Sequence, residues 1–182
     1  ARCSAAMISS QPARFALAER HGLIPVDRRR FPDLDFDERR TKEPGYEQRY
    51  AASEEIFLQT VREVTEGMGV SIFVDYVGAP VLRATLKALA REGVITTAGW
   101  REGMRLTLLR SLECIQRHQH VHTHYARRSE GEAAMEYGER TGWMPPLGPE
   151  DTTWPYDKVP ELVSAFASGL VESYFPLIQV NS

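Results

Sequence analysis

Two kinds of apolar segment alternate along this chain, and the alternation constrains its fold more than any other feature. Segments of helical period are followed by a glycine and then by a short run rich in β-branched residues, as at 70–75 (VSIFVD) and 94–99 (VITTAG). The first of these runs is nearly continuous in apolar character, which is typical of a strand covered by helices on both faces. The sequence therefore predicts an α/β fold built on a doubly wound parallel sheet.

The same patterns place further elements along the chain. We expect strands near 3–8, 23–26, 70–75, 94–99, 121–125 and 174–180. We expect helices near 14–20, from 53 to the glycines at 67 and 69, from 79 to a stop at Gly93, and near 101–117, 129–140 and 159–168. A proline-rich loop should occupy 143–155.

Residues 27–52 interrupt this rhythm with charges of both signs and two prolines. Charge runs of mixed sign are usually solvated faces rather than core. We therefore expect this segment to be a charged surface insertion in the sheet domain.

Composition excludes several classes of protein. The 182 residues are 42% hydrophobic and carry 22 basic against 25 acidic side chains, which fits a globular protein with a core and shows no basic excess for nucleic acid. No apolar run reaches the roughly 20 residues that a membrane helix needs, and the start has no signal-peptide pattern. Cys3 and Cys114 are far apart and form no disulfide or zinc motif. We expect a cytoplasmic protein with no membrane or nucleic-acid partner.

The turn after the first strand carries the most informative side chains. Ser9 and Ser10 end the strand, and Arg14 follows one helical turn later. An acidic residue here would bind a ribose 2′-hydroxyl, whereas hydroxyls beside a guanidinium suit a 2′-phosphate at a helix N-terminus. The alternative is that Ser10 is only a helix cap and Arg14 only a surface residue.

Four histidines alternate at positions 118, 120, 122 and 124, so on a strand they would share one face. Such a face could bind a metal, but alternation is equally expected of an exposed edge, and no carboxylate or thiolate completes a familiar ligand set. We expect no metal site, and we expect Cys114 to be a buried thiol.

Several motifs then occur in a recognisable order: 8–14 (ISSQPAR), 65–70 (TEGMGV), 74–78 (VDYVG) and 93–99 (GVITTAG). Their order and spacing resemble the cofactor domain of medium-chain dehydrogenase/reductases. The long charged insertion and 123–126 (THYA) are most similar to the crotonyl-CoA carboxylase/reductase branch. The resemblance covers almost the whole chain.

This resemblance implies that NADPH is the cofactor and that the turn of Ser9, Ser10 and Arg14 holds its 2′-phosphate. It also implies that two loops run along the cofactor toward the nicotinamide. Their residues are Tyr76, Val77 and Gly78, and Ala98, Gly99 and Trp100.

His124 matches a histidine that helps to hold carbon dioxide beside the substrate in carboxylating members of the branch. His122 and Arg127 depart from that pattern, because the family has a glycine and an asparagine there. Reduction of an activated alkene, such as an enoyl thioester, is therefore expected more firmly than carboxylation.

A member of this family begins with a catalytic domain, and its cofactor domain opens with a strand and a G-x-G-x-x-G-like turn. This sequence contains no such turn. The resemblance thus implies a dinucleotide-binding domain over 1–170 that is incomplete at its N-terminal βα unit, and a return strand over 171–182 toward a missing catalytic domain.

The implied partners are an acyl-thioester substrate on CoA or a carrier protein, the missing N-terminal part or a second polypeptide, and a further copy of the chain in a homo-oligomer. Two other functions stay open: a non-catalytic scaffold subunit, and a quinone or aldehyde reductase of the same superfamily.

Overall fold

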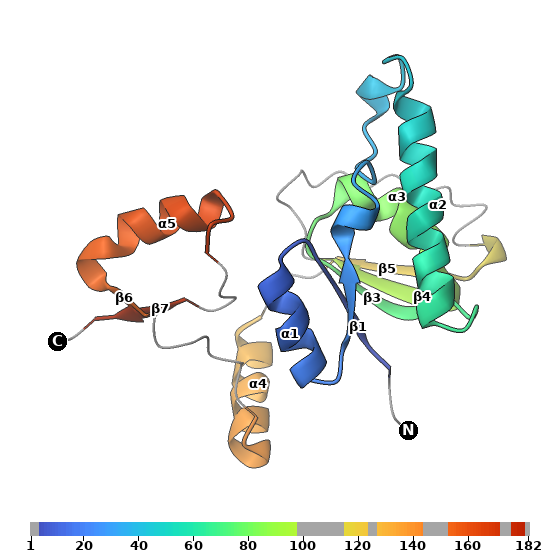
Figure 1. The fold of residues 1–182 in the computed structure, drawn as a ribbon. Helices are drawn as coiled ribbons and strands as arrows, with labels where there is room; N and C mark the ends of the chain where they lie inside the picture. Colours follow the sequence, from blue (N-terminus) through green and yellow to red (C-terminus); the bar gives the residue numbers. More distant parts are fainter. Residues whose placement is uncertain (1–3, 98–114, 124–126, 144–152, 172–175, 181–182) are drawn as a thin grey trace. The chain divides into compact units, whose positions relative to one another are not determined.

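The structure is a computed structural model that describes residues 4–97, 115–123, 127–143, 153–171 and 176–180 (Figure 1). It forms two compact units: the first comprises residues 1–10 and 15–125, and the second comprises residues 11–14 and 126–182. Helices alternate with parallel strands, so the predicted α/β class is confirmed. The expected domain boundary at residue 170 stays a prediction.

The elements follow one another in a βα order. Up to residue 123 they are β1 (Ala6–Ser9), α1 (Pro12–Arg20), β2 (Ile24–Asp27), η1 (Arg28–Arg30), η2 (Glu38–Arg40), α2 (Tyr46–Val64), β3 (Val70–Asp75), α3 (Ala79–Ala88), β4 (Leu89–Thr97) and β5 (His120–Thr123). The later elements are α4 (Arg128–Thr141), β6 (Thr153–Pro155), η5 (Tyr156–Lys158), α5 (Val159–Ala167) and β7 (Leu177–Gln179).

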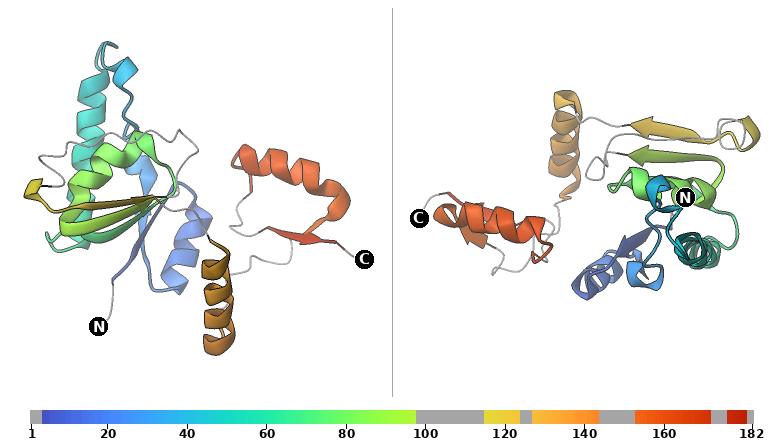
Figure 2. Two further views of the ribbon diagram at one scale, coloured as in Figure 1. Left: turned by 180° about the vertical axis from the view of Figure 1, so that it is seen from behind. Right: turned by 90° about the horizontal axis from the view of Figure 1, so that it is seen from above.

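Parallel pairing brings the carboxyl ends of neighbouring strands into one row. In the first unit β1 pairs with β2, and β3, β4 and β5 pair in that order, as the views in Figure 2 show. Ser9 lies opposite Asp27 at the end of the first pair, and Asp75 lies opposite Thr97 in the second sheet. Ligands of doubly wound sheets bind beyond such carboxyl ends.

Helices α2 and α3 build the core of the first unit against β3 and β4. One buried cluster joins Phe57 of α2 to Ala84 and Ala88 of α3, and a second gathers leucines of α3 with Ile95 of β4. Phe73 of β3 packs against both clusters. The neighbouring side chains Ile72 and Val74 are 66% and 55% exposed. In the described residues, β3 therefore buries one face more fully than the other, unlike the doubly covered strand that we expected.

The charged segment 27–52 contributes to this core, which corrects its prediction as a solvated insertion. Phe31 and Leu34 are buried, and the ring of Phe31 meets the ring of Phe57 edge-on at a centroid distance of 5.3 Å. Tyr46 and Tyr50 are also buried. The charges stay at the surface while the apolar side chains between them point inward, so the average composition of the segment concealed its core residues.

A half-buried polar contact joins α2 to α3. The Tyr50 hydroxyl donates to Glu54 Oε1 at 2.8 Å, and Lys87 Nζ of α3 lies 2.5 Å from Glu54 Oε2. Burial and the hydrogen bond to Glu54 raise the pKa of Tyr50. The Arg83 guanidinium lies over the ring of Phe36, 4.5 Å from its centroid. Segment 27–52 is thus tied to α3 by polar as well as apolar contacts.

Two helix boundaries differ from the prediction. Helix α2 begins at Tyr46, seven residues earlier than expected, directly after Gly45, whose φ is 75°. Helix α3 ends at Ala88, and Leu89 and Gly93 belong to β4 rather than to a helix. The Arg117 guanidinium donates to the carbonyl oxygens of Leu86 and Leu89 and so satisfies the end of α3.

The second unit contains a parallel pair, β6 and β7, with α5 between them in the chain. Strand β7 and helices α4 and α5 fall where the sequence predicts them, whereas β6 lies in the expected proline-rich loop. Most of the helix expected at 101–117 lies outside the described residues, as does Cys114.

Phe31→Ala should lower the free energy of unfolding by about 3–5 kcal/mol, because it removes a fully buried ring. Lys42→Ala, at an exposed position of the same segment, should change it by less than about 0.5 kcal/mol. Urea denaturation followed by circular dichroism measures both. Equal effects would show that segment 27–52 is not part of the core.

Gly93→Ala should also destabilise the chain, by about 1–3 kcal/mol, because a Cβ there would lie 2.9 Å from the carbonyl oxygens of Ala90 and Val70. Gly131→Ala on α4 is the matched control: nothing lies within 4 Å of its Cβ, and alanine favours helix. Thermal unfolding should separate the two variants, and a Gly93→Ala protein as stable as the control would contradict the close strand packing.

Candidate functional site

The β1–α1 turn has the features expected of an anion site. Ser9 is buried at the end of β1, Ser10 is exposed, and Arg14 is half-buried in the first turn of α1. That first turn contains no acidic residue. A helix N-terminus carries partial positive charge, which adds to that of the guanidinium. The roles of Ser9, Ser10 and Arg14 remain predictions.

Three consecutive arginines also lie at this edge, and sequence reasoning missed them. Strand β2 ends at Asp27, opposite Ser9, so Arg28, Arg29 and Arg30 begin at the carboxyl end of the same strand pair. The signal was present as a basic triplet directly after a predicted strand. It was overlooked because 27–52 was treated as one surface insertion.

Asp27 would repel a phosphate, but its charge is paired. Arg29 holds both carboxylate oxygens, with Nε 2.9 Å from Oδ1 and Nη2 2.7 Å from Oδ2. These hydrogen bonds lower the pKa of Asp27, so the carboxylate stays ionised and paired down to lower pH. Arg28 pairs with Asp35 at 2.7 Å. The edge retains a basic excess.

The β3–α3 turn is arranged differently, around a buried carboxylate. Asp75 ends β3 and is 2% exposed. Its Oδ1 accepts from the backbone N–H of Val77 at 2.9 Å, and its Oδ2 accepts from the N–H of Gly78 at 3.0 Å. Gly78 has φ 95°, which favours glycine strongly, and α3 starts at the next residue.

Asp75 therefore occupies the position at the start of α3 that an anion would take. A second negative charge would be repelled there, whereas the start of α1 has no acidic side chain. Of these two strand-to-helix turns, the β1–α1 turn is the one suited to a phosphate.

The loop after β3 presents side chains rather than amide donors. Tyr76 is 76% exposed and Val77 is 37% exposed, while the N–H groups of Val77 and Gly78 both donate to Asp75. If Tyr76, Val77 and Gly78 contact a cofactor as predicted, we propose that they do so by apolar and steric contact, since the N–H groups of Val77 and Gly78 already donate to Asp75. The predicted cofactor residues Ala98, Gly99 and Trp100, and the predicted anchor His124, lie outside the described residues.

Two of the four alternating histidines, His120 and His122, lie on one strand, whereas His118 precedes that strand and His124 lies outside the described residues. The exposed rings of His120 and His122 lie on β5 with centroids 6.4 Å apart. Within the part of the chain that the structure describes, no group of three or more potential ligands gathers around a metal position. No helix in that part is long and apolar enough to cross a membrane.

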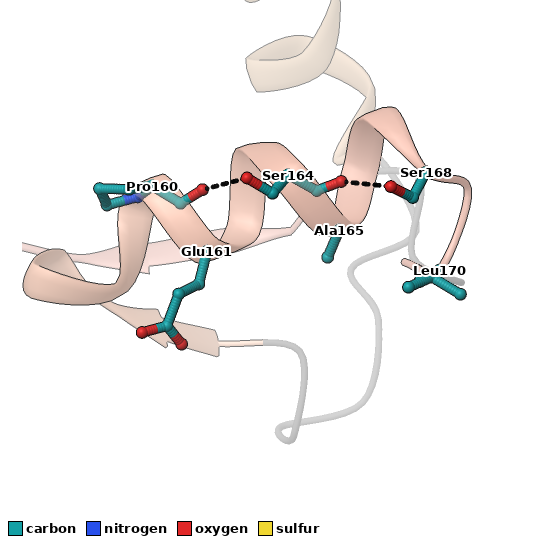
Figure 3. Close-up of a pocket in the computed structure, with 6 residues that line it drawn as sticks. All are labelled: Pro160, Glu161, Ser164, Ala165, Ser168 and Leu170. Carbon is teal, nitrogen blue, oxygen red and sulfur yellow. Dashed lines mark hydrogen bonds between the residues drawn. The ribbon is translucent and has the colours of Figure 1, made fainter.

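A shallow depression on the second unit offers no reactive group. It is lined by Pro160, Glu161, Ser164, Ala165, Ser168 and Leu170 (Figure 3). Both serine hydroxyls donate to carbonyls of their own helix, at 3.0 and 2.9 Å, and Glu161 pairs with Lys158. The candidate site is therefore at the carboxyl ends of the strands β1 to β4.

Solved structures share the fold of this chain. A crotonyl-CoA carboxylase/reductase matches 99% of the chain at 17% identity with a TM-score of 0.73, and the chain covers 41% of it. A variant of the crotonyl-CoA carboxylase/reductase AntE in complex with NADP matches 96% of the chain at 15% identity, with a TM-score of 0.74 and 43% coverage of its own length. A putative alcohol dehydrogenase from Sinorhizobium meliloti 1021 matches 91% at 18% identity, with a TM-score of 0.65 and 41% coverage.

The fold is that of the medium-chain dehydrogenase/reductases. The resemblance read from the sequence is confirmed at the level of the fold, and the chain spans about two fifths of the length of these structures. No protein-family model and no curated protein matches the chain.

Proposed function

We propose that the chain is the NADPH-binding part of a medium-chain reductase that reduces an activated alkene such as an enoyl thioester. The observation that carries this proposal is the contrast between the two strand-to-helix turns. The β1–α1 turn combines two serines and Arg14 with no acidic residue, and the β3–α3 turn is already filled by Asp75. An adenosine 2′-phosphate requires the first kind of turn.

The residues present fit the cofactor along one edge. Ser9, Ser10 and Arg14 would hold the 2′-phosphate, with Arg30 adding positive charge beside it. The loops at 76–78 and 98–100 would line the remainder of the dinucleotide, because such ligands lie across the carboxyl ends of the strands. The NADP named in the AntE structure supports this choice of cofactor.

The cofactor supplies hydride, and the protein binds, orients and excludes water. Hydride added at the β-carbon of an enoyl thioester leaves an electron pair shared between the α-carbon and the carbonyl oxygen. A proton at the α-carbon completes the reduction, and capture of carbon dioxide there would give a carboxylated product. We propose His124 as the group that anchors substrate or carbon dioxide.

The rest of the enzyme would come from a preceding segment or a second polypeptide, and we propose a homo-oligomer in the cytoplasm. A second candidate is a scaffold subunit that binds no cofactor. The intact mass of the natural protein separates the two, since a mass above 20.6 kDa or a second polypeptide supports the reductase.

Arg14→Ala in the complete protein should weaken NADPH binding roughly tenfold to a hundredfold, because a charged hydrogen bond to phosphate contributes about 1.5–3 kcal/mol. NADH lacks the 2′-phosphate, and its binding should change less than about twofold. Arg20→Ala, at an exposed position in the last turn of the same helix, is the control. Fluorescence titration measures the dissociation constants of NADPH and NADH for the wild type and for both variants. Equal losses of affinity for the two cofactors would overturn the assignment of Arg14 to the 2′-phosphate.

The substrate class is tested by comparing turnover of NADPH with a short enoyl-CoA, a quinone and an aldehyde. We expect a kcat/KM for the enoyl-CoA at least about tenfold above the others. The same assay with and without bicarbonate reports carboxylation through the mass of the product. Preference for quinone or aldehyde would move the protein to another branch of the superfamily.

A further inference from the structure

A single buried carboxylate joins the ends of two strands, β3 and β4, to the turn that follows β3. Asp75 Oδ2 accepts from Thr97 Oγ1 at 2.9 Å, as well as from the N–H of Gly78. Thr97 is 4% exposed and ends β4, and 22 residues separate it from Asp75. We call this set of contacts between Asp75, Thr97 and the Val77 and Gly78 amides the clasp.

The clasp involves more donors than an ordinary turn. A turn of this kind forms with one backbone acceptor, whereas here one carboxyl side chain accepts from two backbone N–H groups of the turn and from the hydroxyl of Thr97. Burial makes each of these hydrogen bonds costly to lose, because a carboxylate deprived of donors in the interior is poorly solvated. The segment 76–78 is thereby held in one geometry while its side chains remain exposed.

The clasp fixes the ends of β3 and β4 relative to each other. Asp75 and Thr97 lie opposite one another in the parallel register, so β3 and β4 end at the same edge of the sheet. A dinucleotide whose 2′-phosphate lay at the β1–α1 turn would extend along this edge. Its far half, which carries the nicotinamide, would then meet the turn 76–78 that the clasp holds.

We propose that Asp75 is a positioning residue for the nicotinamide half of NADPH, acting through the turn 76–78, and that Thr97 is its partner. This inference rests on the proposed function. The role is specific to one half of the ligand, since the adenosine phosphate is proposed to lie at Ser10 and Arg14, which the clasp does not touch in the contacts described above.

The test compares two ligands on the full protein. NADPH carries both halves, and adenosine 2′,5′-bisphosphate carries the 2′-phosphate without the nicotinamide. Asp75→Asn keeps the size of the side chain and removes its charge, while Thr97→Val removes the hydroxyl donor at nearly constant volume. Dissociation constants come from calorimetry, and hydrogen exchange at the amides of Val77 and Gly78 reports the turn directly.

Asp75→Asn should weaken NADPH roughly tenfold, leave adenosine 2′,5′-bisphosphate within about twofold, and speed exchange at the Gly78 amide by at least tenfold. Thr97→Val should act in the same direction with a smaller effect, and Thr97→Ser, which restores the donor, should recover most of the affinity. Thr85→Val is the matched control. Its buried hydroxyl donates at 3.0 Å to the carbonyl oxygen of Leu82 in its own helix, and this hydrogen bond is not part of the clasp.

Three results would overturn the inference. Equal losses for both ligands would mean that the clasp only supports the fold, and faster exchange with unchanged NADPH affinity would mean that the turn does not position the cofactor. An effect of Thr85→Val as large as that of Thr97→Val would also remove the specific role. Wild-type protein that binds neither ligand overturns the proposed function itself, and the positioning role with it.

Discussion

Parallel pairing of β3 with β4 is the constraint on which the rest of the first unit depends. Parallel strands need a crossover, and α3 supplies it while its leucines bury Ile95 and its neighbours. The same pairing sets Asp75 opposite Thr97, so the packing that stabilises the sheet also builds the carboxyl edge. Phe73 belongs to both apolar clusters and links the segment 27–52 to this edge through α2 and α3.

The helices and strands whose apolar residues recur at a clear interval could be predicted from the sequence. Strand β3 spans the predicted residues 70–75, and β2, β5 and α4 lie within a few residues of their predicted positions. Local pattern determined these elements because helix and strand place apolar residues at different intervals. The edge that holds the candidate site followed from that order.

The misplaced boundaries depend on contacts between distant residues. Leu89 continues the apolar period of α3, yet it pairs with Val70 in the sheet, and the end of the helix is satisfied by Arg117. The sequence does not mark Asp75 as a site residue, because an aspartate before a turn is common, and only its burial and its hydrogen bond to Thr97 distinguish it. The spacing of apolar residues along the sequence gives no signal for either of these long-range contacts.

The ion pair between Arg29 and Asp27 has a consequence for how cofactor preference can evolve. Asp27 sits opposite Ser9, where an uncompensated carboxylate would suit a ribose hydroxyl and disfavour a phosphate. Arg29 cancels that charge with a bidentate contact made by an exposed side chain. One substitution at an exposed position can therefore change the charge at this edge, and with it the anions that the edge can attract, without changing the fold.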